Sequence, residues 1–386
     1  MNHNSRTYQG FEQGPIRPPS EAYSLLLRVT RNCPWNRCTF CPVYKGSKFS
    51  IRPVDQVKRD IDSVTKHLKR LRNRVDEENS IPQADIRKII QDTDPEDFSS
   101  FQAAFHWFFR GGMKSVFLQD ANSLVIKPSD FVEILNHLKK RFPETERITS
   151  YARSHTIARM KDDDLKAIGA AGLNRLHIGL ESGSNTILKM VKKGSTKEMH
   201  IRAGLKVRRA GIELSEYIMP GLGGRELSEE NALETADALN QINPDFIRLR
   251  TLGIPNQTPL YETYRQGHFQ KCTDVEVVRE ILTFTENLDG ITSFVTSDHI
   301  LNLLAEFEGK LPDDKERMIG ILSDFLAMKP THQRLYQVGR RLGIFSCIQD
   351  MDDPMRLAKA ERAYREIGIT RENADEITDE LMKRFI

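Results

Sequence analysis

Three cysteines lie in one short segment of the 386-residue chain, and thiolates at this spacing can bind a metal centre. Cys33, Cys38 and Cys41 follow the pattern C-x4-C-x2-C, so one loop can turn all three sulfurs inward. The spacing suits tetrahedral zinc, which needs a fourth ligand, but no Cys or His follows until His67. A cubane iron–sulfur cluster normally takes four thiolates, and with three of them one iron stays open to bind a substrate. The loop therefore favours iron–sulfur over zinc, with packed core cysteines as the remaining alternative.

The two other cysteines, Cys272 and Cys347, are isolated in the sequence. An odd number of cysteines with one tight cluster argues against a disulfide framework and for a reducing compartment. We therefore expect a cytoplasmic protein, in which Cys272 and Cys347 pack as small hydrophobic residues.

Composition limits the classes of partner. Lys and Arg total 57 and Asp and Glu total 54, a net charge of +3, which gives no overall signal for a polyanion. Nucleic acid is therefore an unlikely partner on charge alone. One basic run, which is typical of a solvated helix face, could support RNA binding: Lys66, Lys69, Arg70, Arg72 and Arg74. No apolar stretch is long enough to span a membrane, and the N-terminus is polar without an apolar signal core.

Strand and helix patterns alternate from residue 23 onward and must position these side chains. Strands are expected over 23–30, 115–118, 147–152, 175–180, 213–219 and 246–252. Helices are expected over 53–72, 128–141, 162–170, 184–191, 196–210 and 228–241. This alternation requires parallel strands with right-handed crossovers. The cysteine loop follows the first strand, at the strand end where such folds place their chemistry.

The expected fold class is α/β, a partial (β/α)6 TIM-like barrel with a helical C-terminal domain. The predicted domains are an N-terminal arm over 1–20, the barrel over 21–265 with an insertion at about 73–112, and the helical domain over 266–386.

Taken together, these segments resemble the radical S-adenosylmethionine (SAM) superfamily. The cysteine loop, with Phe40 before its last cysteine, is similar to the family's cluster motif, although the family usually has three residues between its first two cysteines. The segment 178–184, IGLESGS, resembles the family's ribose and methionine contact segment. The loop 253–261 is similar to the exit loop of the coproporphyrinogen-oxidase-like and Elongator-like branch.

The resemblance implies a [4Fe–4S] cluster on Cys33, Cys38 and Cys41 and a SAM site at the strand ends. The turn 119–122 corresponds by position to the segment that binds the SAM amino group, although it has no glycine. The implied cofactor-binding residues are Phe40, Gln119, Asp120, Ala121, Asn122, Ser150, Tyr151, Arg153, Glu181, Ser182, Lys193, Glu216 and Gly221.

The implied activity is that of a radical SAM enzyme. An external donor such as flavodoxin or ferredoxin supplies an electron, SAM is cleaved to methionine and a 5′-deoxyadenosyl radical, and the radical abstracts hydrogen from an unidentified substrate. Asp298 and His299 are candidate catalytic residues, and Arg248 and Arg250 on the sixth expected strand would favour an anionic substrate. Two alternatives stay open: a zinc-stapled noncatalytic binding protein and an RNA-modifying enzyme.

Overall fold

A computed structural model describes residues 8–75 and 80–384. The chain divides into two compact units. The first unit contains Met1–Pro34, Val43–His177 and Arg209–Glu213, and the second contains Trp35–Pro42, Ile178–Arg208 and Leu214–Ile386. Within the described ranges, no helix is both long and apolar enough to cross a membrane.

One eight-stranded sheet carries the order β1-β4-β5-β6-β7-β8-β9-β10, and β6 begins in the first unit and ends in the second. Its strands are β1 (Leu25–Arg28), β4 (Ser115–Gln119), β5 (Arg147–Ala152), β6 (Arg175–Glu181), β7 (Glu213–Ile218), β8 (Phe246–Leu249), β9 (Phe294–Thr296) and β10 (Gly309–Lys310). The pairs β1–β4, β4–β5, β7–β8 and β8–β9 are parallel, and β10 is antiparallel to β9. A separate antiparallel ribbon joins β2 (Thr30–Arg31) to β3 (Ser50–Ile51).

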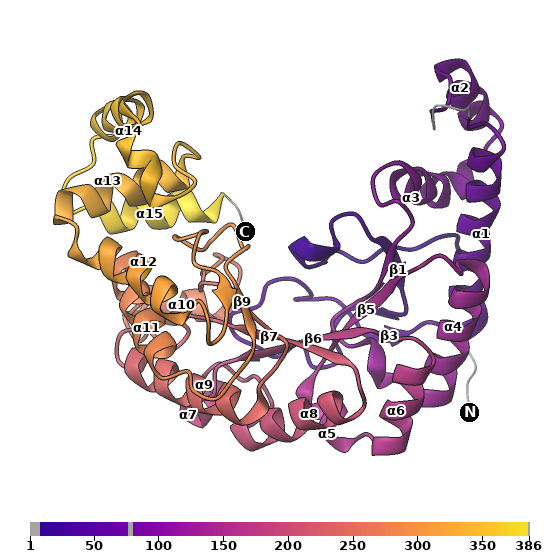
Figure 1. Ribbon diagram of the computed structural model, residues 1–386, viewed down its shortest axis with the longest axis horizontal. Helices are drawn as coiled ribbons and strands as arrows, with labels where there is room; N and C mark the ends of the chain where they lie inside the picture. The colour runs from indigo at the N-terminus through magenta and orange to yellow at the C-terminus, as the bar shows by residue number, and fades with distance from the viewer. Residues whose placement is uncertain (1–7, 76–79, 385–386) are drawn as a thin grey trace. The chain divides into compact units, whose positions relative to one another are not determined.

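Helices follow the strands of the first unit along the chain (Figure 1). They are α1 (Val54–Arg72), α2 (Gln83–Gln91), α3 (Phe98–Phe109), α4 (Pro128–Arg141), α5 (Ser154–Arg159) and α6 (Asp162–Ala170). In α1, the residues Val57, Ile61, Val64 and Leu68 recur at helical spacing, and all four are buried. This stripe is why α1 packs against β1, α3 and α4.

The second unit is built mainly from helices that follow its strands. They are α7 (Asn185–Met190), α8 (Lys197–Arg209), α9 (Ser228–Ile242), α10 (Pro259–Arg265), α11 (Asp274–Glu286), α12 (Lys315–Ala327), α13 (Pro330–Arg341), α14 (Pro354–Glu366) and α15 (Ala374–Lys383). Helix α11 packs on both α9 and α12, and α13 packs on α14 and α15.

The α/β class and the parallel strand order are confirmed. The sheet is longer than expected, because β9 pairs in parallel with β8 and β10 extends the edge within residues expected to be helical. Both strands are too short to show the two-residue periodicity of a strand in the sequence. The domain boundaries stay a prediction, and part of the predicted insertion, residues 76–79, lies outside the described residues.

Candidate cofactor site

The cysteine loop joins the two units, with Cys33 in the first and Cys38 and Cys41 in the second. All three cysteines are half-buried, and none forms a disulfide. Asn32 and Asn36 have left-handed backbone angles, φ 68° and 44°, a conformation that asparagine tolerates well. Across residues 8–75 and 80–384, no three His, Cys, Asp or Glu side chains gather as a metal-binding group, so the thiolate ligands stay a prediction.

Backbone bonds fix the part of the loop that belongs to the second unit. The Thr39 N–H donates to the Val191 carbonyl at 2.9 Å, and the Leu260 N–H donates to the Thr39 carbonyl at 3.0 Å. Phe40 is buried in an apolar cluster with Val191 and Leu222. This packing accounts for an aromatic residue at position 40, and its cofactor contact stays a prediction.

Asp120, at the C-terminal end of β4, is fully buried and receives three hydrogen bonds within the first unit. The Arg28 Nε and the Asn32 N–H donate to its Oδ2 at 2.7 and 2.9 Å, and the Tyr44 hydroxyl donates to its Oδ1 at 3.0 Å. Burial, followed by the Asp120 charge, raises the pKa of Tyr44, and Cys33 acts in the same direction. Asp120 was predicted to bind the SAM ammonium, but here its oxygens serve the segments that flank the cysteines.

Gln119 binds the N-terminal arm. Its Oε1 accepts from the Gly14 N–H at 2.8 Å, and its Nε2 donates to the Gly14 and Ile16 carbonyls at 3.1 and 2.8 Å. Gly14 approaches so closely that a Cβ there would lie 2.2 Å from the Asp120 Oδ1. The arm is therefore packed against the end of β4 over these residues.

The remaining predicted residues of the first unit also have partners in the chain. Asn122 accepts from the Arg153 N–H at 3.1 Å and donates to the Thr156 hydroxyl at 2.8 Å, and Ala121 is half-buried beside it. The Ser150 hydroxyl donates to the Leu118 carbonyl at 2.9 Å. The Tyr151 ring packs edge-on against Phe117, with the ring centroids 5.1 Å apart. These contacts show that the side chains stabilise the fold. Whether the same side chains contact SAM stays a prediction.

In the second unit, an ion pair lies at the end of β6. Lys193 Nζ lies 2.8 Å from Glu181 Oε1, and each side chain is 13% exposed. Glu181 itself has a left-handed backbone with φ 65°. Ser182 is fully buried and its hydroxyl accepts from the Ser184 N–H at 3.0 Å. The structure thus brings together two predicted SAM residues, Glu181 and Lys193.

Glu216 on β7 is one of the buried carboxyl groups with unsatisfied oxygens among the described residues. It is fully buried, and neither of its oxygens has a hydrogen-bond partner. Burial raises its pKa well above the usual value, while Lys193 lowers it and Glu181 raises it further. A buried carboxyl group without a partner is costly, so this side chain is suited to a ligand that donates hydrogen bonds.

The glycine turn after β7 is held by a residue that the sequence analysis missed. Gly221 has φ 84°, which favours glycine, and its N–H donates to Glu280 Oε1 at 2.8 Å. The Ser228 hydroxyl and the Asn231 amide donate to the same carboxyl group at 2.5 and 2.7 Å. Burial raises the pKa of Glu280 to about 7, against the three donors, which lower it. A glutamate within the apolar stripe of α11, beside Val277 and Ile281, was the available sequence signal.

The candidate catalytic residues have different environments. Asp298 Oδ2 accepts from Arg248 Nη1 at 2.6 Å, and the Arg248 side chain is only 7% exposed. The Leu301 N–H donates to His299 Nδ1 at 3.3 Å, so a neutral ring carries its proton on Nε2. Burial, followed by the charge of Arg250, lowers the pKa of His299 to about 4. His299 is therefore neutral at pH 7, and Asp298 is engaged as an ion-pair partner.

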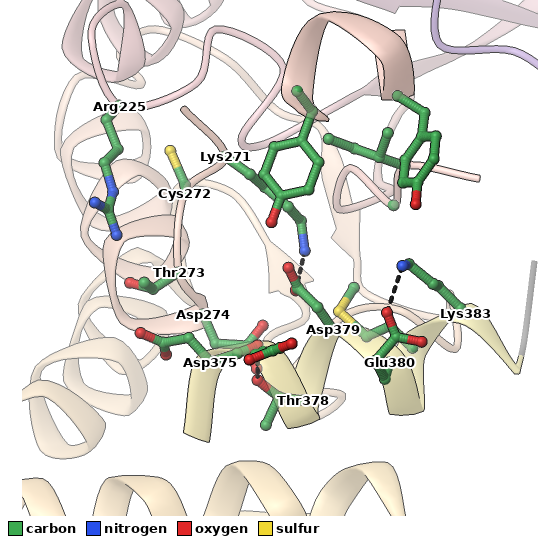
Figure 2. Close-up of a pocket in the computed structure, with 16 residues that line it drawn as sticks. Arg225, Lys271, Cys272, Thr273, Asp274, Asp375, Thr378, Asp379, Glu380 and Lys383 are labelled. Carbon is green, nitrogen blue, oxygen red and sulfur yellow. Dashed lines mark hydrogen bonds and ion pairs between the residues drawn. The ribbon is translucent and has the colours of Figure 1, made fainter. Parts of the chain in front are cut away.

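A cavity of about 410 Å³ lies elsewhere in the second unit (Figure 2). Its wall pairs Lys271 with Asp379, and Lys383 with Glu380 at 2.5 Å. Cys272 also lines it, and burial raises the pKa of this thiol to about 12, so it stays protonated. No predicted cofactor residue lines this cavity.

A sequence model of the Radical SAM superfamily matches residues 87–239. Over these residues the chain is similar to the radical SAM superfamily. The matched range starts after the cysteine loop and includes the ends of β4, β5, β6 and β7. Members of this superfamily are enzymes that use a [4Fe–4S] cluster and SAM. The branch within the superfamily stays a prediction.

Two curated relatives are similar in sequence. The tRNA uridine(34) acetyltransferase of Methanocaldococcus infernus is 21% identical over 292 residues, covering 71% of this chain and 51% of the relative. The threonylcarbamoyladenosine tRNA methylthiotransferase MtaB of Bacillus subtilis is 20% identical over 263 residues, covering 66% and 54%. The chain thus spans about half the length of these relatives. The solved Elp3 of M. infernus with an N-terminal deletion has a TM-score of 0.41 and 18% identity, covering 55% of each chain.

The residues present fit SAM unequally. In the second unit, Glu216 has unsatisfied buried oxygens suited to hydroxyl donors, whereas the Lys193 ammonium, suited to a carboxylate, is already paired with Glu181. In the first unit, Gln119 and Asp120 already have three hydrogen bonds each from the chain. The second unit therefore carries the side chains that best fit this cofactor.

Proposed function

We propose that the chain is a radical SAM enzyme in which Cys33, Cys38 and Cys41 hold a [4Fe–4S] cluster. A cluster held by these cysteines would supply the electron for reductive cleavage of SAM, and with it hydrogen-abstraction chemistry on a substrate. The observation that carries the proposal is the buried, unsatisfied Glu216 on β7, within the range that matches the superfamily.

The chain's own residues bind and orient the cofactor. Glu216 accepts hydrogen bonds from the ribose hydroxyls, and Lys193, positioned by Glu181, binds the carboxylate of SAM. The turn at Gly221, whose φ of 84° favours glycine, would offer backbone contacts to the adenine. Because Glu216 is fully buried, its hydrogen bonds form away from water, where they are strongest.

The test is anaerobic reconstitution with iron and sulfide, followed by reduction and addition of SAM. We expect 5′-deoxyadenosine by mass spectrometry from the wild-type chain and none from Cys38→Ala. Glu216→Gln should retain the cluster but bind SAM at least tenfold more weakly, measured by calorimetry. Colourless protein with bound zinc and no product would instead establish the zinc-stapled binding protein.

RNA is our proposal for the substrate class, and it replaces the expectation that nucleic acid is an unlikely partner. It is supported by the names of two relatives, both of which are tRNA-modifying enzymes. The basic run on α1 contributes little, because Lys66, Arg72 and Arg74 pair with Asp97, Glu144 and Asp85 within the chain.

Two measurements test the RNA proposal. Filter binding with total tRNA should show a binding constant whose logarithm falls linearly with the logarithm of salt concentration. Addition of tRNA should also increase the yield of 5′-deoxyadenosine, since substrate consumes the radical. No binding at low salt and no change in yield would contradict an RNA substrate. The cytoplasmic location and the flavodoxin or ferredoxin donor remain proposals of the same kind.

A further inference from the structure

Asp120 ties together the two segments that flank the predicted cluster ligands. Asn32 immediately precedes Cys33, and Tyr44 follows Cys41 by three positions. Both donate to the Asp120 carboxylate, the Asn32 N–H at 2.9 Å and the Tyr44 hydroxyl at 3.0 Å. We propose that Asp120 is a positioning residue for Cys33, which it holds in a binding orientation by clamping both ends of the cysteine loop. This inference rests on the proposed function and deepens it.

The clamp acts on the backbone next to Cys33. Asn32 has φ 68°, and three bonds hold it there: its N–H to Asp120, Arg28 Nη2 to its Oδ1 at 3.2 Å, and its Nδ2 to the Lys48 carbonyl at 2.7 Å. A left-handed asparagine fixed in this way sets the direction in which the next residue leaves the strand. The direction of Cys33 therefore depends on the Asp120 network.

Charge complementarity makes the clamp specific for a carboxylate. Arg28 Nε lies 2.7 Å from Asp120 Oδ2, and the Asp120 side chain is fully buried. All the partners lie on the first unit, on β1, beside β2 and after the loop. Alanine at position 120 would leave the Arg28 guanidinium, the Asn32 N–H and the Tyr44 hydroxyl without their acceptor.

A second carboxylate in the same unit provides a matched control. Asp60 on α1 is also fully buried, and it accepts from Arg52 Nη1 at 2.6 Å, the Tyr8 hydroxyl at 2.8 Å and the Glu12 N–H at 3.4 Å. Its partner set is therefore the same: one arginine, one tyrosine hydroxyl and one backbone N–H. Asp60 ties the N-terminal arm, whereas Asp120 ties the cysteine loop.

The experiment compares Asp120→Ala with Asp60→Ala in the full chain. After reconstitution, iron and sulfide are measured per chain, and the thermal unfolding midpoint of each variant is recorded. The second readout is the rate at which iodoacetamide alkylates Cys33 before reconstitution, followed on the Cys33 peptide by mass spectrometry. Tyr44→Phe and Tyr8→Phe form a milder pair, in case either alanine variant does not fold.

We expect Asp120→Ala to hold at least fivefold less iron and to alkylate at Cys33 at least threefold faster than wild type. Asp60→Ala should change both far less, because it reaches the loop only indirectly, through Arg52, which also donates to the Arg28 carbonyl at 2.8 Å. In the milder pair, only Tyr44→Phe should lose iron. The clamp would be overturned if both variants of a pair lost iron in proportion to the decrease in their unfolding midpoints. It would also be overturned if neither variant lost iron.

The same data separate this inference from the proposed function. A wild-type chain that binds no iron overturns the proposed function, and the Cys33 alkylation rates then decide the clamp without any metal. Equal rates in Asp120→Ala and Asp60→Ala would overturn it. A wild-type chain that binds iron and cleaves SAM, with full iron in Asp120→Ala, would overturn the clamp alone.

Discussion

Asp60 and Asp120 lie in two regions of one unit and accept hydrogen bonds from the same kinds of donor, but they hold different segments of the chain. Each carboxylate is fully buried and binds an arginine, a tyrosine hydroxyl and a backbone N–H. They differ in what the partners belong to, the arm at Asp60 and the cysteine loop at Asp120. Because the donors are of the same kinds at Asp60 and Asp120, the role of each carboxylate depends on the segment that its donors belong to.

The arginines differ as well, and this difference sets the size of the expected effects. The Arg52 side chain at Asp60 is fully buried, whereas the Arg28 side chain at Asp120 is 15% exposed. A third carboxylate, Glu280 in the second unit, is bound by three uncharged donors. All three carboxyl groups are buried, and Asp60 and Asp120 each have one arginine partner whereas Glu280 has none.

The largest effect on stability is expected at Asp60. Asp60→Ala leaves the buried Arg52 with only the Glu12 carboxylate, 3.5 Å from its Nε, as a compensating charge, so it should lower the free energy of unfolding by about 3 kcal/mol. Asp120→Ala should cost less, because water can reach Arg28. Urea unfolding followed by circular dichroism measures both. A larger loss in Asp120→Ala would break the comparison.

Glu280 sharpens the comparison through its dependence on pH. Its pKa is raised to about 7 in the folded chain, so folding favours the protonated form. Its contribution to stability is therefore full below about pH 4.5 and is lost as pH rises to about 7. Relative to Glu280→Gln, the wild-type free energy of unfolding should fall by up to about 3 kcal/mol over this range.

Urea titrations at several pH values measure that difference. Glu216 also has a raised pKa and contributes with the same sign, so only the difference between wild type and Glu280→Gln is assigned to Glu280. A difference that stays constant between pH 5 and 8 would contradict the raised pKa.

The tyrosines provide a smaller and closely matched test. Tyr8→Phe and Tyr44→Phe each remove one hydroxyl donor from a buried carboxylate, so each should lower the free energy of unfolding by about 1 kcal/mol. Denaturant midpoints compared at equal m-values measure the two losses. Losses that differ by more than twofold would show that the two sites are not equivalent in energy.

The smallest effect is expected for a pair outside these three sites. Lys66 and Asp97 lie 2.8 Å apart, but their side chains are 57% and 31% exposed. Lys66→Ala should change the free energy of unfolding by less than about 1 kcal/mol, because water and salt screen an exposed pair. A loss as large as that of Asp60→Ala would mean that burial does not set the scale.

Much of the fold could be predicted from the sequence. The apolar spacing of α1 and the strand at 147–152 were found to within a residue or two, because long periodic segments carry a strong signal. Strands β9 and β10 were missed since they contain only three and two residues. Their pairing depends on contacts with β8 that sequence periodicity does not record.

The site was predictable in its residue types and less so in their partners. The sequence shows that Glu181 and Lys193 are close along the chain, and the structure pairs them. It also shows a carboxylate at position 120, but its donors Arg28 and Tyr44 are distant in sequence. The sequence position of Asp120 therefore does not reveal these partners, and its contact with SAM stays a prediction.

Gly14 has a consequence for which sequences the arm can carry. A methyl group at this position would lie 2.2 Å from the Asp120 Oδ1, and 3.5 Å from the Gln119 Cβ. Any side chain at position 14 would clash with the Asp120 carboxylate and move it away from its donors Asn32 and Tyr44. Position 14 of the polar N-terminal arm is thus closed to side chains, and a single change there would alter the loop that begins at residue 33.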